Sequence, residues 1–454
     1  MKSYRYSILA VLCLSAALVP FTVTSINLAL PHIANELNLS AVALGWIVTA
    51  FLLPAAIFQI PLAKIGDMYG RKKVLLSGVV LFMVASLGCA LSHTGALLIA
   101  CRFVQGVASA MLFATTLAII TSVFPARERG RAFGTITAVI YFALASGPFI
   151  GGIFTHYRGW RSIFYVTISL ALLTLAGILV FFKGEWRDAK DDHFDWQGSL
   201  IYAFGLSAFI YGCSLLPSIV GFGLIAAGFA GFTLFVHYEK KQTSPVFNVN
   251  MFFENRVFRM SSFAALINYS ATFSVTFMLS LYLHYVKGFD AQKAGLILII
   301  QPIFMTIFSP LAGKWSDRTK NVAVIATSGM AIMAVCLMVM VFLTAETPVS
   351  ILFAIFAVLG FGYALFASPN TIIIMGSVEK RYLGMASATT GTMRVIGQSI
   401  SMGITMMMIA VFVGNAPITI DNYQLFMKCM HYTFGVFSVF CLFGVYTSMS
   451  RGKT

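Results

Sequence analysis

Six polar or charged side chains stand inside long apolar runs of the chain: Thr22, Asn27, Arg102, Gln105, Asn268 and Arg394. A charge in an apolar segment is costly unless it is paired or hydrated, so such residues commonly mark a ligand or ion pathway. These six side chains can form hydrogen bonds with a ligand, and the two arginines can attract a negative charge. No nucleophile–base set and no metal-ligand spacing accompanies them. The sequence therefore favours binding over catalysis and predicts no enzyme, no metal and no cofactor.

A second group of residues combines a carboxylate with basic neighbours in two similar loops. "AKIGDMYGRKK" (63–73) contains Asp67, Gly70 and Arg71, and "GKWSDRTK" (313–320) contains Asp317 and Arg318. Each aspartate comes four residues after a small residue. A single carboxylate among cations suits a charge-assisted contact that forms in one state and breaks in another. We therefore predict a conformational gate at these loops, with a plain solvated topology signal as the alternative.

The elements that carry these residues are predicted to be membrane helices. The chain has 454 residues, of which 59% are hydrophobic and 10% charged. Its apolar runs suffice to cross a bilayer, and backbone polar groups in lipid must be satisfied within the segment. We predict an all-α membrane protein with fourteen spans, at 8–30, 44–62, 74–93, 97–122, 132–154, 162–182, 198–216, 219–237, 258–284, 294–312, 322–343, 350–372, 384–413 and 431–448.

The net charge of +15 is explained by topology. With the N-terminus inside, 23 of the 30 Lys and Arg fall in cytoplasmic segments, 5 outside and 2 within spans. This asymmetry follows the positive-inside rule. It predicts a multi-pass protein of the cytoplasmic membrane with both termini in the cytoplasm. Anionic lipid headgroups account for the basic loops, so we expect membrane lipids as partners and no nucleic acid.

The repeated loop divides the chain into two halves. Repeats of this kind relate transporter halves by an axis along the membrane normal. The longest polar linkers, 183–197 and 239–257, flank a helix pair joined by "LPS" (216–218). We predict an N-terminal six-helix half (1–182), an inserted pair with its linkers (183–257) and a C-terminal six-helix half (258–454).

Several short motifs, in order along the chain, resemble those of one family. The 63–73 loop matches its Gly-x-x-x-Asp motif with Ala63 in place of Gly. "RFVQG" (102–106) matches its fourth-helix motif, and "SGPFIGG" (146–152) its fifth-helix motif. "GWRSIF" (159–164), "FDWQG" (194–198) and "SPN" (368–370) also match. Over nearly its whole length the chain resembles the major facilitator superfamily, in its fourteen-helix drug:proton antiporter branch.

The resemblance implies a role for each motif. The 63–73 loop would latch the two halves together. Arg102 would face the first helix and a central cavity, and Arg394 would lie in the same cavity. A structural bond to a helix-1 carbonyl is the alternative for Arg102, and helix pinning for Arg394. Gly147, Pro148, Gly151 and Gly152 would form the antiporter motif. The physical alternative is close helix packing at a kink.

The acidic residue that is usual in the first helix of this branch is missing. "FTVTSINLALP" (21–31) keeps the branch's first-helix pattern, but Thr22 stands where an acid is usual. All 15 Asp and Glu fall in loops or at helix ends. Two deep arginines without a buried carboxylate would make a cavity positive and favour an anionic or zwitterionic substrate.

The resemblance implies a secondary exporter of amphipathic compounds, coupled to an ion gradient through protons. A dedicated exporter of one anionic or lipid-like metabolite is the alternative, and a non-transporting receptor on the same fold is a third possibility. We expect a small-molecule substrate and a monomer.

Overall fold

The computed structural model describes residues 2–37, 39, 41–190, 192–289, 291–319, 321–414 and 423–451, and these contain helices and no strand. The first group of helices comprises α1 (Lys2–Leu37), α2 (Ala41–Ile57), α3 (Gln59–Tyr69), α4 (Arg71–Ala90), α5 (Gly95–Val123), α6 (Ala126–Arg158) and α7 (Arg161–Phe181). A pair follows, α8 (Trp196–Ser214) and α9 (Ile219–Glu239). The rest are α10 (Val249–Glu254), α11 (Arg256–Thr272), α12 (Val275–Leu281), η1 (Tyr282–Val286), α13 (Ala291–Leu298), α14 (Ile300–Arg318), α15 (Val322–Met340), α16 (Val349–Gly376), η2 (Lys380–Tyr382), α17 (Leu383–Phe412) and α18 (Tyr423–Met449).

The predicted all-helical membrane architecture is confirmed. Among the described residues, twelve helices are long and apolar enough to cross a membrane, and a bent pair makes thirteen. The helix α8 is not among them, but it has 19 residues and packs along α9. A count of fourteen is compatible with this arrangement.

The second predicted span, 44–62, is bent and longer than expected. Its two parts, α2 and α3, meet at an angle of 46° and continue to Tyr69. Pro61 has no backbone N–H to donate to the carbonyl of Ile57, and its ring crowds that carbonyl, so the helix breaks at Phe58. Other helices also exceed their predicted ends, as α6 does on both sides of 132–154. Hydropathy marks the apolar part of a helix, whereas backbone hydrogen bonding continues into its polar flanks.

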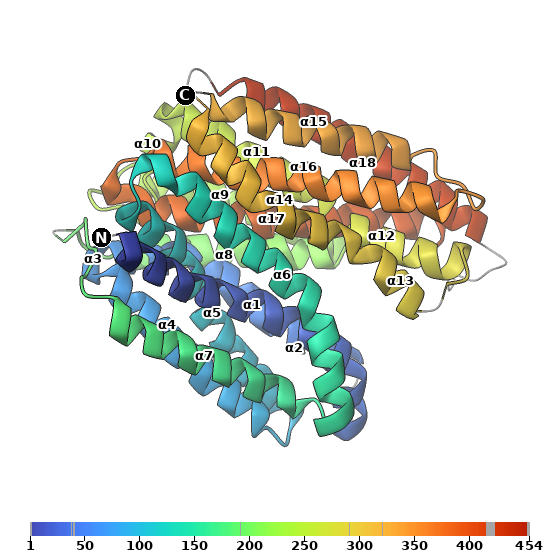
Figure 1. Cartoon of the computed structure of the whole chain (residues 1–454), viewed down its shortest axis with the longest axis horizontal. Helices are drawn as coiled ribbons and strands as arrows, with labels where there is room; N and C mark the ends of the chain where they lie inside the picture. The colour runs from blue at the N-terminus through green and yellow to red at the C-terminus, as the bar shows by residue number, and fades with distance from the viewer. Residues whose placement is uncertain are drawn as a thin grey trace.

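Two groups of helices pack mainly within themselves (Figure 1). Helices α1 to α7 form one group and α11 to α18 the other. Both chain termini lie at one end of the bundle, called here the terminal end, where the ribbons of the two groups come together; they diverge toward the other end (Figure 1). Between the groups, α6 packs on α14, and α17 packs on α3 and α5. One apolar cluster joins α1, α4 and α5 with Ile374, Leu383 and Met385, which closes the terminal end.

The pair α8 and α9 forms an antiparallel hairpin held by close backbone contact. Gly205 and Gly231 face each other, and a Cβ at Gly231 would lie 2.7 Å from the Cα of Gly205. Small residues allow this approach between helices in a membrane. The Tyr202 hydroxyl lies 3.1 Å from the Thr392 hydroxyl, which ties α8 to α17. The pair is therefore attached to the second group as well as to itself.

Candidate functional site

Asp67, at the end of α3, makes a contact between the two groups of helices. Its carboxylate accepts hydrogen bonds from Arg71 Nε at 2.7 Å and from the backbone N–H of Gly384 at 3.1 Å. Gly384 is in the first turn of α17, where free N–H groups and the helix dipole attract an anion. Arg71 continues across the seam and donates to the carbonyl of Lys380 at 3.0 Å. Asp67 and Arg71 are both buried, so this contact is shielded from water.

Gly70 makes the turn that places Arg71 beside Asp67. Its φ of +124° is in the region that favours glycine. A Cβ there would also lie 2.4 Å from the side chain of Glu185. The chain around Glu185 covers the turn, because Trp186 accepts from the Arg71 N–H at 2.9 Å. The backbone therefore requires glycine at this position, and a side chain there would also displace the flexible side chain of Glu185.

Asp317, at the end of α14, makes the matching contact in the opposite direction. Its two carboxylate oxygens accept from the N–H groups of Gly130 at 2.7 Å and Arg131 at 2.8 Å. Both donors belong to the second turn of α6, in the first group. A Cβ at Gly130 would lie 2.2 Å from the carbonyl of Gly313, so the helices touch backbone to backbone. Arg318, the neighbouring residue, is exposed.

The two aspartates thus form a pair of latches with the same design. Asp67 of the first group binds the start of α17 in the second, and Asp317 of the second group binds the start of α6 in the first. Within the described ranges, the hydrogen bonds that join 1–182 directly to 258–454 lie at or near the terminal end. The structure places Asp67 and Arg71 at one contact between the groups and Asp317 at another, and their role as a gate remains a prediction.

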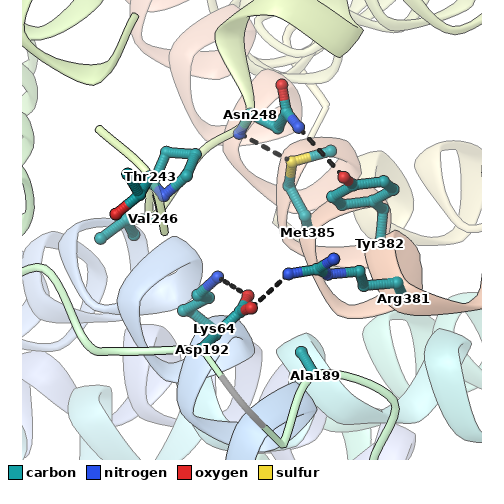
Figure 2. A pocket seen from close by; sticks show the side chains of 10 residues that line it. Lys64, Ala189, Asp192, Thr243, Val246, Asn248, Arg381, Tyr382 and Met385 are labelled. Carbon is teal, nitrogen blue, oxygen red and sulfur yellow. Dashed lines mark hydrogen bonds and ion pairs between the residues drawn. The ribbon is translucent and has the colours of Figure 1, made fainter. Parts of the chain in front are cut away.

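A third contact between the groups runs through a linker and was not predicted. Asp192 follows α7, and its carboxylate binds Lys64 of α3 at 2.5 Å and Arg381 at the start of the α17 region (Figure 2). The three side chains line a cavity of about 120 Å³ together with Asn248, Tyr382 and Met385. Asn248, from the other linker, donates to the Tyr382 hydroxyl at 3.2 Å. We call Lys64, Asp192 and Arg381 the linker clamp.

Burial by itself would raise the pKa of Asp192, but the hydrogen bonds and charges of Lys64 and Arg381 lower it below its ordinary value. The carboxylate is therefore charged at neutral pH. Sequence reasoning missed this residue because Asp192 stands in a charged run, 183–197, where a solvated loop is the simplest interpretation. The only signal was the position of the run between two predicted units.

Arg102 is placed differently from the prediction. It is 1% exposed and lies inside the first group. Its Nε donates to the carbonyl of Ile47 at 3.2 Å, its Nη1 donates to Gln105 Oε1 at 2.6 Å, and its guanidinium stacks over Phe51 at 4.2 Å. Gln105 Nε2 continues to the Ser86 hydroxyl at 2.7 Å. The carbonyl belongs to α2, so the expected contact with the first helix is replaced by one that joins α2, α4 and α5.

The two first-helix candidates face different surroundings. Thr22 is buried; its hydroxyl donates to the carbonyl of Leu18 at 2.7 Å and lies 3.3 Å from the Thr167 hydroxyl of α7. Thr22 therefore packs inside the first group, whereas Asn27 is exposed.

Asn268 of α11 is buried in the second group, where its amide contacts the Met333 sulfur at 3.4 Å. Thr22, Asn27 and Asn268 therefore do not line one common site.

The "SGPFIGG" segment brings α6 close to α1. A Cβ at Gly147 would lie 1.9 Å from the Thr24 hydroxyl, and one at Gly151 would lie 2.7 Å from the Ser25 Cβ. The Ser25 hydroxyl donates to the Gly147 carbonyl at 2.8 Å. Pro148 lies inside α6, and Gly152 is half-buried beside Gly151. This geometry is the close helix packing expected on physical grounds, within one group.

Arg394 of α17 lies where the two groups face each other. Its guanidinium stacks over the ring of Phe113 of α5, 4.4 Å from the ring centre. Tyr141 of α6 and Tyr269 of α11 lie near it. Phe113, Tyr141, Tyr269 and Arg394 are all half-buried. The structure therefore places this arginine, unlike Arg102, between elements of both groups.

Fold and latches together define a multi-pass helical membrane protein whose two groups of helices are held together at one end. The sequence profile of the major facilitator superfamily matches residues 12–402. The chain belongs to that superfamily, as its motifs predicted. It is a membrane transporter and not an enzyme.

Individual relatives cover most of the chain. A riboflavin transporter, RibZ, of Clostridioides difficile (strain 630) is 27% identical over 86% of this chain and 85% of its own length. The multidrug resistance protein Stp of Mycobacterium tuberculosis (strain CDC 1551 / Oshkosh) is 29% identical over 84% of this chain and 71% of its own. Among solved structures, the proton:xylose symporter XylE superposes with a TM-score of 0.68 over 98% of this chain and 95% of its own, at 17% identity.

Proposed function

We propose that this protein is a secondary active transporter that exports amphipathic compounds by alternating access. The observation that carries the proposal is the pair of latches, Asp67 on α17 and Asp317 on α6. Each latch is a small set of charge-assisted hydrogen bonds between the groups, and such contacts can break without unfolding either group. Rocking of the two groups around a central site would then expose that site to each side of the membrane in turn.

The terminal end is proposed to face the cytoplasm, with the protein in the cytoplasmic membrane. The excess of Lys and Arg in the segments at this end supports the orientation. In the conformation described, the closed latches would then shut the cytoplasmic entrance. Both groups and the site between them come from one chain, so a monomer is proposed as the working unit.

The division into 1–182, 183–257 and 258–454 remains the proposed domain organisation. The close packing of α8 on α9, and the linkers that run from this pair to the gate, support 183–257 as a separate insertion. In this scheme the inserted pair is more than a spacer, because both of its linkers reach residues at the seam between the halves.

The coupling ion is proposed to be a proton. The resemblance to drug:proton antiporters supports this, although Thr22 replaces the usual first-helix acid and is bonded inside the first group. Purified protein in liposomes should take up a fluorescent drug when a pH gradient is imposed, and a protonophore should abolish the uptake. Uptake driven by a Na⁺ gradient instead would refute proton coupling but not transport.

A second candidate is a dedicated exporter of one anionic or lipid-like metabolite. The observation that favours it is Arg394, a cation at the seam with no carboxylate bound to it among the described residues. The names of the relatives support both candidates, one being a multidrug resistance protein and the other a riboflavin transporter. Competition of a metabolite library against drug uptake in the same liposomes would separate them: broad, weak inhibition indicates the first candidate, and one strong inhibitor the second.

A further inference from the structure

Arg394 differs from the other deep cation in what its guanidinium contacts. Over the described residues, its side chain is recorded in a stacking contact with Phe113 but in no hydrogen bond and no ion pair. Guanidinium carries five N–H donors. The side chain is half-buried and none of its nitrogens is a fully buried atom without a partner, so its donors are accessible to water or to a ligand that supplies acceptors.

The side chains around Arg394 come from both groups of helices. Phe113 and Tyr141 belong to α5 and α6, and Tyr269 and Tyr363 to α11 and α16. Tyr141, Tyr269 and Tyr363 lie near Arg394, and with Phe113, which the guanidinium covers, these side chains form one cluster. Tyr363 is nearly fully buried, whereas Phe113, Tyr141, Tyr269 and Arg394 are half-buried.

The cluster combines three properties that select one kind of ligand. The open guanidinium supplies charge and paired donors that fit a carboxylate or a phosphate. The rings of Phe113, Tyr141 and Tyr269 supply flat apolar surface on which an aromatic ring can stack. The tyrosine hydroxyls supply further polar contacts at the edges of these rings.

We propose that Arg394, Phe113, Tyr141 and Tyr269 form the substrate site, and that it takes planar aromatic compounds bearing an acidic group. The proposal rests on the proposed transport function and narrows its substrate class. A cationic aromatic compound of the same shape is disfavoured, since no described carboxylate is recorded in an ion pair with Arg394 and the arginine would repel it.

The placement of the cluster also links binding to movement. Phe113 and Tyr141 move with the first group, and Tyr269 and Arg394 with the second. A ligand that bridges them has different contacts in each arrangement of the groups, which is the requirement for shifting a conformational equilibrium. The same ligand in a site within one group would have no such effect.

The test uses two dyes with the same ring system and opposite charge, fluorescein and rhodamine 123, with the purified full-length chain in detergent. Fluorescence anisotropy should show that fluorescein binds more tightly than rhodamine 123. Arg394→Gln should weaken fluorescein binding by about tenfold or more, and Arg394→Lys, which keeps the charge but not the planar fork, by less. Lys241→Gln removes one exposed charge outside the cluster and should leave binding unchanged.

Fluorescein binding that is absent from the wild type, or equal in wild type and Arg394→Gln, overturns the proposal. A preference for rhodamine 123 does the same. If Arg394→Gln fails to give folded protein, Tyr269→Phe and Arg394→Lys provide the comparison. Dye uptake into liposomes tests the substrate site and the transport function separately. If wild type and Arg394→Gln take up the dye equally, only the proposed site is refuted. If the wild type takes up no compound at all, the transport proposal is refuted.

Discussion

Arg102 and Arg394 are both arginines within apolar spans, yet their surroundings differ. Arg102 is bonded to Ile47 and Gln105 and packed on Phe51, all within the first group of helices. The Arg394 guanidinium stacks on the ring of Phe113, no hydrogen bond from it is recorded among the described residues, and its neighbours belong to both groups. The first arginine holds α2, α4 and α5 together. The guanidinium of Arg394 is available to bind a ligand.

The contacts inside a group and between the groups can be compared in the same way. Close helix contacts occur inside a group, as between Gly147 and Thr24, and also between the groups, as between Gly130 and Gly313. Hydrogen bonds between the groups gather at or near the terminal end and depend on a few carboxylates. Contacts inside a group should determine stability, and the hydrogen bonds between the groups should determine which conformation is populated.

The largest expected effect is on Arg102. Arg102→Met keeps a similar volume but leaves Gln105 Oε1 without its donor and removes a second hydrogen bond from the Ile47 carbonyl. The unpaired buried acceptor and the lost hydrogen bond should lower the free energy of unfolding by about 2–4 kcal/mol. Arg394→Met, which removes no recorded hydrogen bond, should change it by less than about 1 kcal/mol. Thermal unfolding of both variants in detergent measures the difference; equal losses would remove the distinction between the two arginines.

A smaller loss of stability is expected where α1 and α6 touch. Gly147→Ala places a Cβ 1.9 Å from the Thr24 hydroxyl, so the Thr24 side chain must rotate or the helices must separate. Overpacking of this kind should lower stability by about 1–3 kcal/mol. Gly223→Ala is the matched control, because Gly223 of α9 has open space where a Cβ would lie and should tolerate alanine. Unchanged thermal unfolding of Gly147→Ala would show that this contact inside a group is not tight.

The latch of Asp317 should affect conformation more than stability. In Asp317→Asn one of the two carboxylate acceptors becomes an amide donor that faces an N–H group, so the closed terminal end should weaken by about 1–2 kcal/mol. That is roughly a tenfold shift toward the open arrangement. Spin labels replacing the exposed Lys73 and Lys314, in a background without cysteine, would report the shift as a longer distance.

The matching Asp67→Asn variant should shift the same equilibrium in the same direction. A loss of folded protein without any change in the label distance would instead place both latches among the stabilising contacts.

The linker clamp should have the smallest effect. Asp192→Asn weakens contacts to Lys64 and to the half-exposed Arg381, which should favour opening by less than about 1 kcal/mol. Because the pKa of Asp192 is lowered, its contribution is fully present above the ordinary value near 4 and is lost only as pH falls through the lowered pKa. The difference between wild type and Asp192→Asn in label distance should therefore stay constant from about pH 5.5 to 8. A difference that disappears within this range would mean that Asp192 titrates there.

The sequence by itself determined the membrane class, most spans and the two loops that carry Asp67 and Asp317. Apolar runs of membrane length have one solution for their backbone groups in lipid, and the repeated Asp67 and Asp317 loops are local patterns. The bend in the second span was not predicted, because the break at Phe58 depends on the steric contact between the Pro61 ring and the carbonyl of the preceding turn.

Only the tertiary structure decided which polar residues share a site. Arg102, Thr22, Asn268 and Arg394 look alike in sequence, since each is a polar residue in an apolar run. Their roles differ because helix rotation and packing turn three of them into the interior of a group and one toward the seam. The partners of Asp192 were equally hidden, because Lys64 and Arg381 are far apart in the chain and reach the same carboxylate only in the folded protein.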